Sequence, residues 1–81
     1  MSDDWYERAH ALNIRRMFES YGKEHASLIY EVYGTSRAHE EGNGHETRLY
    51  IPMFSARAAC DEMQRRNVLP LAQREMAYSS A

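Results

Sequence analysis

Hydrophobic and polar positions in the first quarter of the chain repeat with the period of a helix. Ile14, Met17, Phe18 and Tyr21 are spaced i, i+3, i+4, i+7, which places them on one face of a helix. Gly22 follows this stripe and can adopt the left-handed conformation that commonly ends a helix. The pattern therefore predicts a helix that runs to about Tyr21, with one apolar face turned toward a core.

The first turns of this helix carry acidic residues and a second apolar stripe. Residues 2–4 supply a capping side chain and acids that suit the positive end of the helix dipole. Trp5, Ala9 and Leu12 also fall at helical spacing, but they point almost opposite to the first stripe. Such a helix is either kinked near Asn13 or covered on both sides. In so small a chain the second cover could be another subunit, so the pattern favours a homodimer.

Two later segments have the pattern of strands. In SLIYEVYG (residues 27–34) apolar positions alternate, and β-branched and aromatic residues dominate. TRLYIPMF (residues 47–54) alternates in the same way as far as Pro52, which cannot donate a ladder hydrogen bond and so marks an edge or the end of a strand. Because residues 42–44 between them can form a tight turn, the two segments predict a β-hairpin.

The segment HEEGNGHE (residues 39–46) permits two interpretations. Its Gly-Asn-Gly centre tolerates the positive φ angles that a tight hairpin turn requires. His39 and His45 could instead bind a metal with one of the neighbouring glutamates. Zinc needs three or four fixed ligands, and a glycine-rich turn fixes none of them well. We therefore predict a turn, with no metal and no other cofactor.

The last third of the chain returns to helical spacing. Ser55 can cap a helix over residues 56–67, and Asn67 is suited to a left-handed stop. Pro70 would fit the first turn of a short helix over residues 70–78, although alternation there also permits a strand. We favour the helix.

These elements combine into one small α+β domain over residues 1–81. Its predicted order is an N-terminal helix, a two-stranded antiparallel β-hairpin, then one long and one short C-terminal helix (α-β-β-α-α). A domain of this length hides only about 60–65% of the surface of its unfolded chain, so its core is thin.

Several features bear on location and on chemistry. A single cysteine excludes an intramolecular disulfide and favours a reducing compartment. No apolar run approaches the ~18 residues that a membrane span needs. The acidic start lacks the basic opening of a signal peptide, so we expect a cytoplasmic protein. Cys60 lies on the stripe expected to be buried, the four histidines are scattered, and no glycine-rich phosphate loop precedes a helix. We therefore predict that the protein is not an enzyme.

Charge and tyrosine content direct attention to binding. The net charge is −2, and residues 1–46 hold nine acids against five bases, which argues against simple nucleic-acid binding. On the predicted hairpin, two tyrosines, a glutamate and an arginine share the face opposite the core, where they either pair across the strands or meet a partner. The acids could meet a basic groove where phosphates would lie. The predicted partner-binding residues are Asp3, Asp4, Glu31, Tyr33, Glu40, Glu41, Glu46, Arg48 and Tyr50.

The predicted α-β-β-α chain, with the charged HEEGNGHE between SLIYEVYG and TRLYIPMF, resembles small phage and mobile-element proteins. Within that class it is similar in architecture to the anti-CRISPR proteins directed at type I systems. The resemblance covers the whole chain, shares no motif and transfers no residue. It implies a non-enzymatic inhibitor, a DNA mimic that binds the type I surveillance complex (Cascade) and keeps target DNA out. The alternative is a small dimeric nucleic-acid-binding or transcriptional regulatory module that uses Arg57, Arg65, Arg66 and Arg74.

Overall fold

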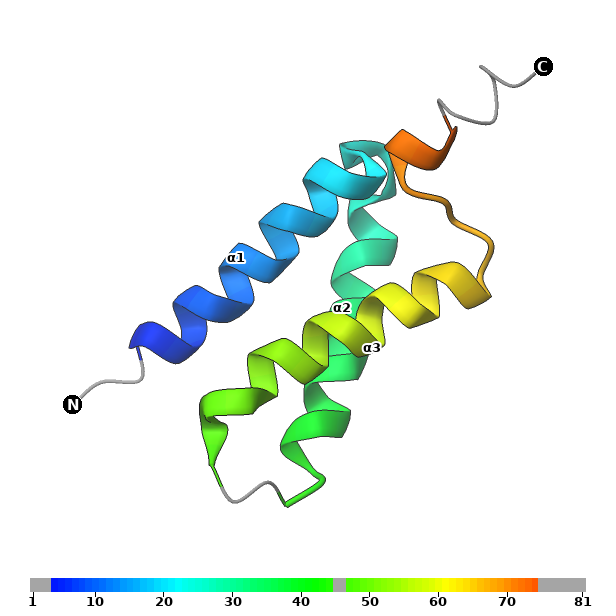
Figure 1. Ribbon diagram of the computed structural model, residues 1–81. Helices are drawn as coiled ribbons and strands as arrows, with labels where there is room; N and C mark the ends of the chain where they lie inside the picture. The colour runs from blue at the N-terminus through cyan, green and yellow to red at the C-terminus, as the bar shows by residue number, and fades with distance from the viewer. Residues whose placement is uncertain (1–3, 45–46, 75–81) are drawn as a thin grey trace.

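The computed structural model describes residues 4–44 and 47–74, and every regular element in these two ranges is helical (Figure 1). A further helical turn covers residues 71–74. The elements are α1 (Asp4–Tyr21), the 3₁₀ turn η1 (Lys23–His25), α2 (Ala26–Glu41), the 3₁₀ turn η2 (Arg48–Tyr50) and α3 (Ile51–Arg65). The predicted α+β class is wrong, because the described chain is an all-α domain.

The three long helices form a bundle in which α3 crosses α2 and α1 lies beside the pair (Figure 1). Most contact between helices is made by α2 with α3, and α1 packs less extensively against both. Helix α1 begins at one end of the bundle, and the helical turn over residues 71–74 lies near the opposite end (Figure 1). The start of α1 therefore lies at the end of the molecule where α2 finishes and α3 begins.

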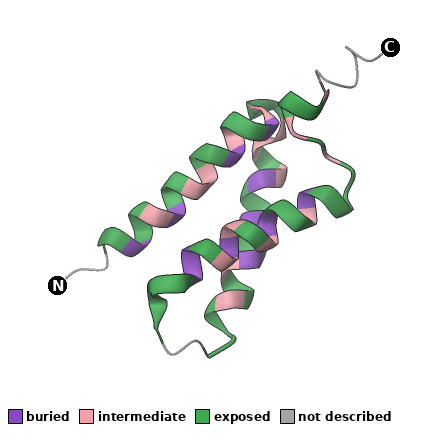
Figure 2. Cartoon of the chain, viewed as in Figure 1, coloured by how far each residue is buried: buried purple, intermediate pink, exposed green. Residues whose placement is uncertain are grey.

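The hydrophobic core lies where the faces of the three helices meet, and Figure 2 shows buried positions concentrated at the crossing of α2 and α3. A fully buried Val, Ile or Met side chain stabilises the fold by about 1.5–3 kcal/mol relative to an exposed one. The buried core residues are Met17, Tyr21, Ile29, Val32, Tyr33, Ala59 and Met63.

The segment SLIYEVYG belongs to α2 and is not a strand. Ile29, Val32, Tyr33 and Ser36 are all buried, and their spacing of i, i+3, i+4, i+7 is that of a helix. A short continuous apolar run fits the period of a helix as well as that of a strand. The prediction of a strand therefore rested on the β-branched and aromatic content, which was misleading here. Strand propensity mainly reflects packing on a half-buried surface, and packing between two helices overrides it here.

The segment TRLYIPMF is also not a strand, since it forms η2 and the first turn of α3. Pro52 lies in that first turn, where a missing N–H costs no hydrogen bond. The buried face of α3 repeats every four residues at Ile51, Ser55, Ala59 and Met63. Ser55 is therefore a fully buried residue inside the helix, and the prediction that it caps the helix is wrong.

The predicted helix boundaries that depend on special backbone angles are confirmed. The first helix ends at Tyr21, and Gly22 has φ of 99°. Asn67 follows α3 with φ of 62°, the left-handed stop expected of it. Residues 42–44 form a turn, but the turn follows a helix and does not connect strands. The short last helix is present over residues 71–74, and the rest of its predicted range lies outside the described residues.

The second apolar stripe of α1 faces outward. The helix is continuous through Asn13, and Trp5 and Leu12 are 46% and 44% exposed. The described part of the chain therefore leaves this stripe largely uncovered. The homodimer that the stripe suggested stays a prediction.

Candidate functional site

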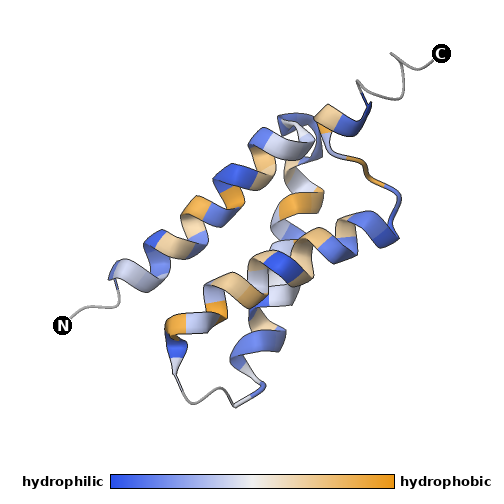
Figure 3. Ribbon diagram, viewed as in Figure 1, coloured by the Kyte–Doolittle hydropathy of each residue, from blue (hydrophilic) through white to orange (hydrophobic). Residues whose placement is uncertain are grey.

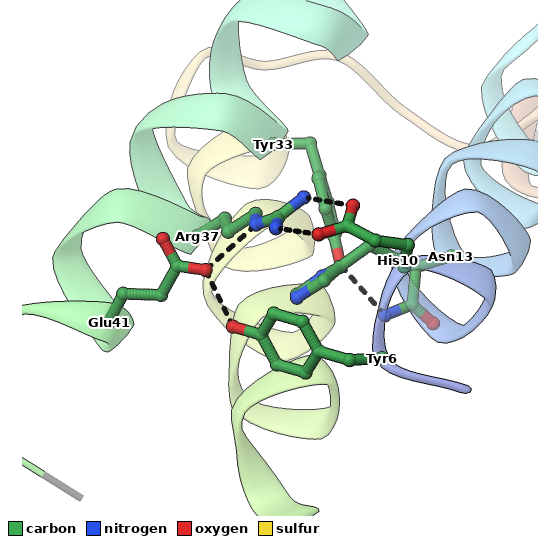
Figure 4. Close-up of polar contacts among 7 residues, drawn as sticks. Tyr6, His10, Asn13, Tyr33, Arg37 and Glu41 are labelled. Atoms are coloured by element: carbon green, nitrogen blue, oxygen red, sulfur yellow. Dashed lines mark hydrogen bonds and ion pairs between the residues drawn. The ribbon is translucent and has the colours of Figure 1, made fainter. Parts of the chain in front are cut away.

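The start of α1 is held against the end of α2 by a group of charged and polar side chains (Figure 4). Arg37 of α2 donates two hydrogen bonds to the carboxylate of Glu7, at 3.1 and 2.7 Å. The Nε of Arg37 donates a third, at 3.0 Å, to Oε2 of Glu41. The hydroxyl of Tyr6 donates to the same oxygen at 2.6 Å. A bidentate guanidinium of this kind fixes geometry as well as adding energy, so α1 and α2 are held in one register.

The protonation states of this group follow from its hydrogen bonds. The bonds from Tyr6 and then Arg37 hold the pKa of the Glu41 carboxyl below its usual range, and the bond from Arg37 does the same for the pKa of Glu7. Burial and then the hydrogen bond to Glu41 raise the pKa of Tyr6 to about 12. Both glutamates are therefore ionised near neutral pH and already engaged within the protein, which weakens them as ligands for a partner's cations.

A second set of polar contacts lies deeper and joins all three long helices. The side-chain nitrogen of Asn13 donates to the Tyr33 hydroxyl and to the Pro52 carbonyl, both at 2.9 Å. The Nδ1 atom of His10 shares a short hydrogen bond with the same Tyr33 hydroxyl. His10 and Tyr33 are only 2% and 1% exposed. One tyrosine hydroxyl thus connects α1 to α2, and Asn13 extends the connection to α3.

The ring of Tyr6 joins the two polar groups to η2. Its centroid lies 5.5 Å from that of Trp5 and 4.5 Å from that of His10, both in edge-to-face geometry. The guanidinium carbons of Arg37 and Arg48 lie 5.2 and 4.8 Å from the same centroid. Contacts of this kind contribute about 0.5–2 kcal/mol each, depending on burial. They fix Arg48, and with it η2, beside the start of α1.

Exposed apolar side chains gather around this corner of the molecule. Leu49, Tyr50 and Met53 are 61%, 50% and 56% exposed, and Figure 3 shows the apolar positions at the start of α3. Trp5 lies at the same end of the molecule, with its ring against that of Tyr6, which Arg48 also contacts. Exposed apolar clusters with Trp, Tyr and Arg are typical of protein interfaces. We call Trp5, Arg48, Leu49, Tyr50 and Met53 the corner surface.

The structure brings five of the predicted partner-binding residues to this end of the molecule. Asp4 begins α1, Glu40 and Glu41 end α2, and Arg48 and Tyr50 form part of η2. They converge because helix ends meet there, and no hairpin is involved.

The remaining predicted residues do not join them. Tyr33 was expected on an exposed strand face, and this is wrong because it lies in the core under the polar contacts. Glu31 is exposed on α2 and pairs with Arg66 at 3.4 Å. Asp3 and Glu46 lie outside the described residues. On the predicted second strand, Leu49 and Met53 alternate with Arg48 and Tyr50 and would face the core; this is wrong, because both are exposed.

The buried polar residues of α1 were missed, although the sequence carries a signal for them. Tyr6, His10 and Asn13 follow a helical spacing that continues through Met17 to Tyr21. The buried face of α1 is therefore one stripe that changes from polar to apolar along its length. A search for apolar residues alone finds only its second half.

Elsewhere the described residues offer little chemistry. None of them forms a group of three or more His, Cys, Asp or Glu side chains that could hold a metal. Cys60 was expected to be buried, and this is wrong because it is exposed. A shallow groove of about 310 Å³ between α2 and α3 is lined on its polar side by His39, Glu62, Arg65 and Arg66, but both arginines are paired with the glutamate. No helix in the described ranges is long and apolar enough to cross a membrane.

No protein-family model, curated protein or solved structure matches this chain.

Proposed function

We propose that this protein is a non-enzymatic interaction module, of the inhibitor type, that binds a partner protein through the corner surface. The observation that carries the proposal is the exposure of Trp5, Leu49, Tyr50 and Met53 around Arg48. Trp, Tyr and Arg are the residues that most often dominate binding energy at protein interfaces. The buried polar contacts beneath them hold the backbone of this corner in place, and pre-organisation lowers the entropy cost of binding.

Acidic residues at the rim suggest the chemistry of the partner. Asp4, Glu7, Glu40 and Glu41 lie at the same end of the molecule as the corner surface. A basic groove that normally holds nucleic acid, with an apolar pocket beside it, would complement this arrangement. Arg37 neutralises part of the acidic charge, so the acids would mainly steer association and the apolar side chains would provide most of the affinity.

The type I CRISPR surveillance complex is one partner of that chemistry. The resemblance to anti-CRISPR proteins relied on a β-hairpin, and residues 27–41 and 48–54 are helical. That support is withdrawn with the hairpin. The proposal now rests on the exposed aromatic and apolar side chains and on the acidic rim, and the surveillance complex is retained as the first partner to test.

A matched pair of leucine variants tests the proposal. Leu49→Asp places a charge in the corner surface, and Leu69→Asp makes the same change at a 43%-exposed position after α3, toward the other end of the molecule. Affinity for a purified type I surveillance complex, and inhibition of its target-DNA binding, would be measured for both variants and for the parent protein. We expect Leu49→Asp to weaken binding at least tenfold and Leu69→Asp to leave it unchanged. Equal binding by the two variants would reject this surface. No binding by the parent protein would reject this partner.

The alternative of direct nucleic-acid binding has less support. Of the four arginines predicted for it, Arg65 and Arg66 pair with Glu62 at 2.7 and 2.9 Å, and Arg74 donates to the Tyr21 carbonyl at 2.9 Å. The carboxylates of Glu62 and Glu24 already offset part of the positive charge of these guanidiniums, which weakens their attraction for phosphates. A salt-sensitive mobility shift of DNA by the purified protein would favour the alternative, because phosphate contacts release counterions.

A further inference from the structure

The two halves of α1 are anchored by different physical forces. Met17 and Tyr21 in the second half belong to the hydrophobic core. Tyr6 and His10 in the first half are equally buried but lie outside that core, among hydrogen-bonded side chains. The attachment of residues 4–13 to the rest of the bundle therefore depends on hydrogen bonds, and so on where protons reside, as well as on the packing of the buried Tyr6 ring.

The hydrogen bonds around the imidazole determine which nitrogen carries the proton in neutral His10. The Asn13 amide nitrogen has two hydrogens, and it gives one to the Pro52 carbonyl and one to the oxygen of Tyr33. The Tyr33 hydroxyl still has its own hydrogen, and its other neighbour is Nδ1 of His10. Tyr33 therefore donates and Nδ1 accepts, which places the His10 proton on Nε2. That Nε2 atom is buried and has no hydrogen-bond partner.

A second proton on His10 would have to go to Nδ1, where the Tyr33 hydroxyl already points its hydrogen. Tyr33 would then have to rotate its O–H bond away while its oxygen accepts from both His10 and Asn13. A buried donor without an acceptor costs about 1–3 kcal/mol. Protonation therefore adds a second buried donor without an acceptor, the Tyr33 hydroxyl, to the Nε2–H of His10, which already has none.

The charged groups around His10 do not compensate for this. Arg37 of α2 and Arg48 of η2 both lie against the Tyr6 ring that His10 contacts. The carboxylates of Glu7 on α1 and Glu41 on α2 favour a cation, but both are bound to Arg37.

The remaining neighbours carry no charge that could stabilise a protonated ring. Tyr6 and Tyr33 are neutral, and α3 contributes the Pro52 carbonyl, which Asn13 already occupies. Burial and then Arg37 outweigh the two carboxylates and lower the pKa of His10 from its ordinary 6.5.

We infer that His10, Tyr33 and Asn13 form a proton-sensitive latch: uptake of a proton by His10 releases residues 4–13 of α1 from α2 and α3, while the hydrophobic core stays assembled. Because the folded-state pKa of His10 lies below its ordinary 6.5, the latch is fully closed above about pH 6.5. It weakens progressively as the pH falls from there to the folded-state value. The inference does not depend on the proposed partner.

Hydrogen exchange measured segment by segment between pH 7.5 and 5.0 tests the latch. After correction for the intrinsic pH dependence of exchange, the opening constant of amides in residues 6–13 should rise on the order of tenfold per pH unit below 6.5, down to the folded-state pKa. Amides of α2 and α3 should keep their protection. The variant His10→Gln keeps an acceptor for Tyr33 but cannot titrate, so its opening constant should be flat. His39→Gln, at an exposed position on α2, should behave as the parent protein does.

Three results would overturn the latch: a flat profile in the parent protein, the same pH dependence in His10→Gln, or simultaneous loss of protection in all three helices. Long-range ¹H–¹⁵N correlation of the unsubstituted protein at pH 7.5 provides a second measurement that needs no variant. We expect the Nε2–H tautomer for His10. Observation of the Nδ1–H tautomer would overturn the inference even if His10→Gln failed to fold.

Discussion

Replacement of Tyr33 by phenylalanine should destabilise the fold far more than the same change elsewhere on the helix. The variant keeps the ring that packs in the core and removes one hydroxyl. That hydroxyl accepts from Asn13 and, with the proton of His10 on Nε2 as inferred above, donates to Nδ1 of His10. Tyr33→Phe therefore leaves the His10 Nδ1 atom without a donor in a site that is 2% exposed.

The magnitude follows from burial. A buried polar atom without a partner costs about 1–3 kcal/mol, and Asn13, which is half-buried and keeps its bond to Pro52, adds about 0.5–1 kcal/mol. The gain from no longer burying a hydroxyl offsets part of this. We expect a net loss of about 2–3 kcal/mol in the free energy of unfolding. For a domain of 81 residues this corresponds to a fall in Tm of about 10–20 °C.

Tyr30→Phe is the matched control, because Tyr30 lies on the same helix and is 57% exposed. Thermal and urea unfolding at pH 7.5, followed by circular dichroism, should show less than about 0.5 kcal/mol for the control. A double-mutant cycle of Tyr33→Phe with Asn13→Ala should give a coupling energy of about 0.5–3 kcal/mol. A loss below 1 kcal/mol for Tyr33→Phe, or a coupling energy near zero, would refute the reasoning.

Four further substitutions test other parts of the structure. Arg37→Gln should reduce the loss of stability that acid causes between pH 5 and 3. The folded-state pKa values of both glutamates that Arg37 binds lie below 4.5, so their contribution to stability is present above that pH and is lost below it. Urea unfolding at several pH values measures this, and an unchanged dependence of stability on pH would contradict it. Gly22→Ala should destabilise the fold by about 1–2 kcal/mol, because φ is 99° at that position. Gly34→Ala, in mid-helix with open space around it, should stabilise the fold by about 0.5–1 kcal/mol. Thermal melts that change stability in the same direction for both variants would be inconsistent with these backbone angles. Leu12→Asp should convert a dimer to a monomer in light scattering if the second apolar stripe of α1 is a subunit interface, and a monomeric parent protein would remove that prediction.

Sequence patterns predicted the C-terminal ends of α1 and α3 correctly but assigned the middle of the chain wrongly, for separate physical reasons. Gly22 and Asn67 act through the local backbone, where the residue type alone restricts the choice of φ. The segments at residues 27–34 and 47–54 depend instead on what packs against them. Both periods fit a short apolar run, and Pro52 fits a strand edge as well as a helix start. Only the packing of α2 on α3 selects the helix, and the residues that make this contact are far apart in the sequence.

The candidate site was predicted in part, because charge and aromatic content are visible in the sequence and proximity is not. Asp4, Glu41 and Arg48 were chosen for their chemistry, and they share one end of the molecule only because α1 and α2 are antiparallel neighbours. Tyr33 was chosen for the same chemistry and is buried. A tyrosine on a strand face opposite the core would be exposed, so the error in fold class caused the error in the site.

The latch and the corner surface share one structural element, the start of α1, so proton uptake must be linked to the binding of any partner that contacts Trp5. Trp5 belongs to the corner surface and is covalently next to Tyr6, whose ring contacts His10. A partner that requires Trp5 in place binds only the closed form, and a proton on His10 favours the open form. By reciprocity, the factor by which acid weakens such binding equals the factor by which the partner opposes protonation of His10. A partner that uses only Leu49, Tyr50 and Met53 contacts η2 and α3, and its binding would depend less on the proton, through the contact of Arg48 with the Tyr6 ring. The pH dependence of affinity thus distinguishes which part of the corner surface carries the contact.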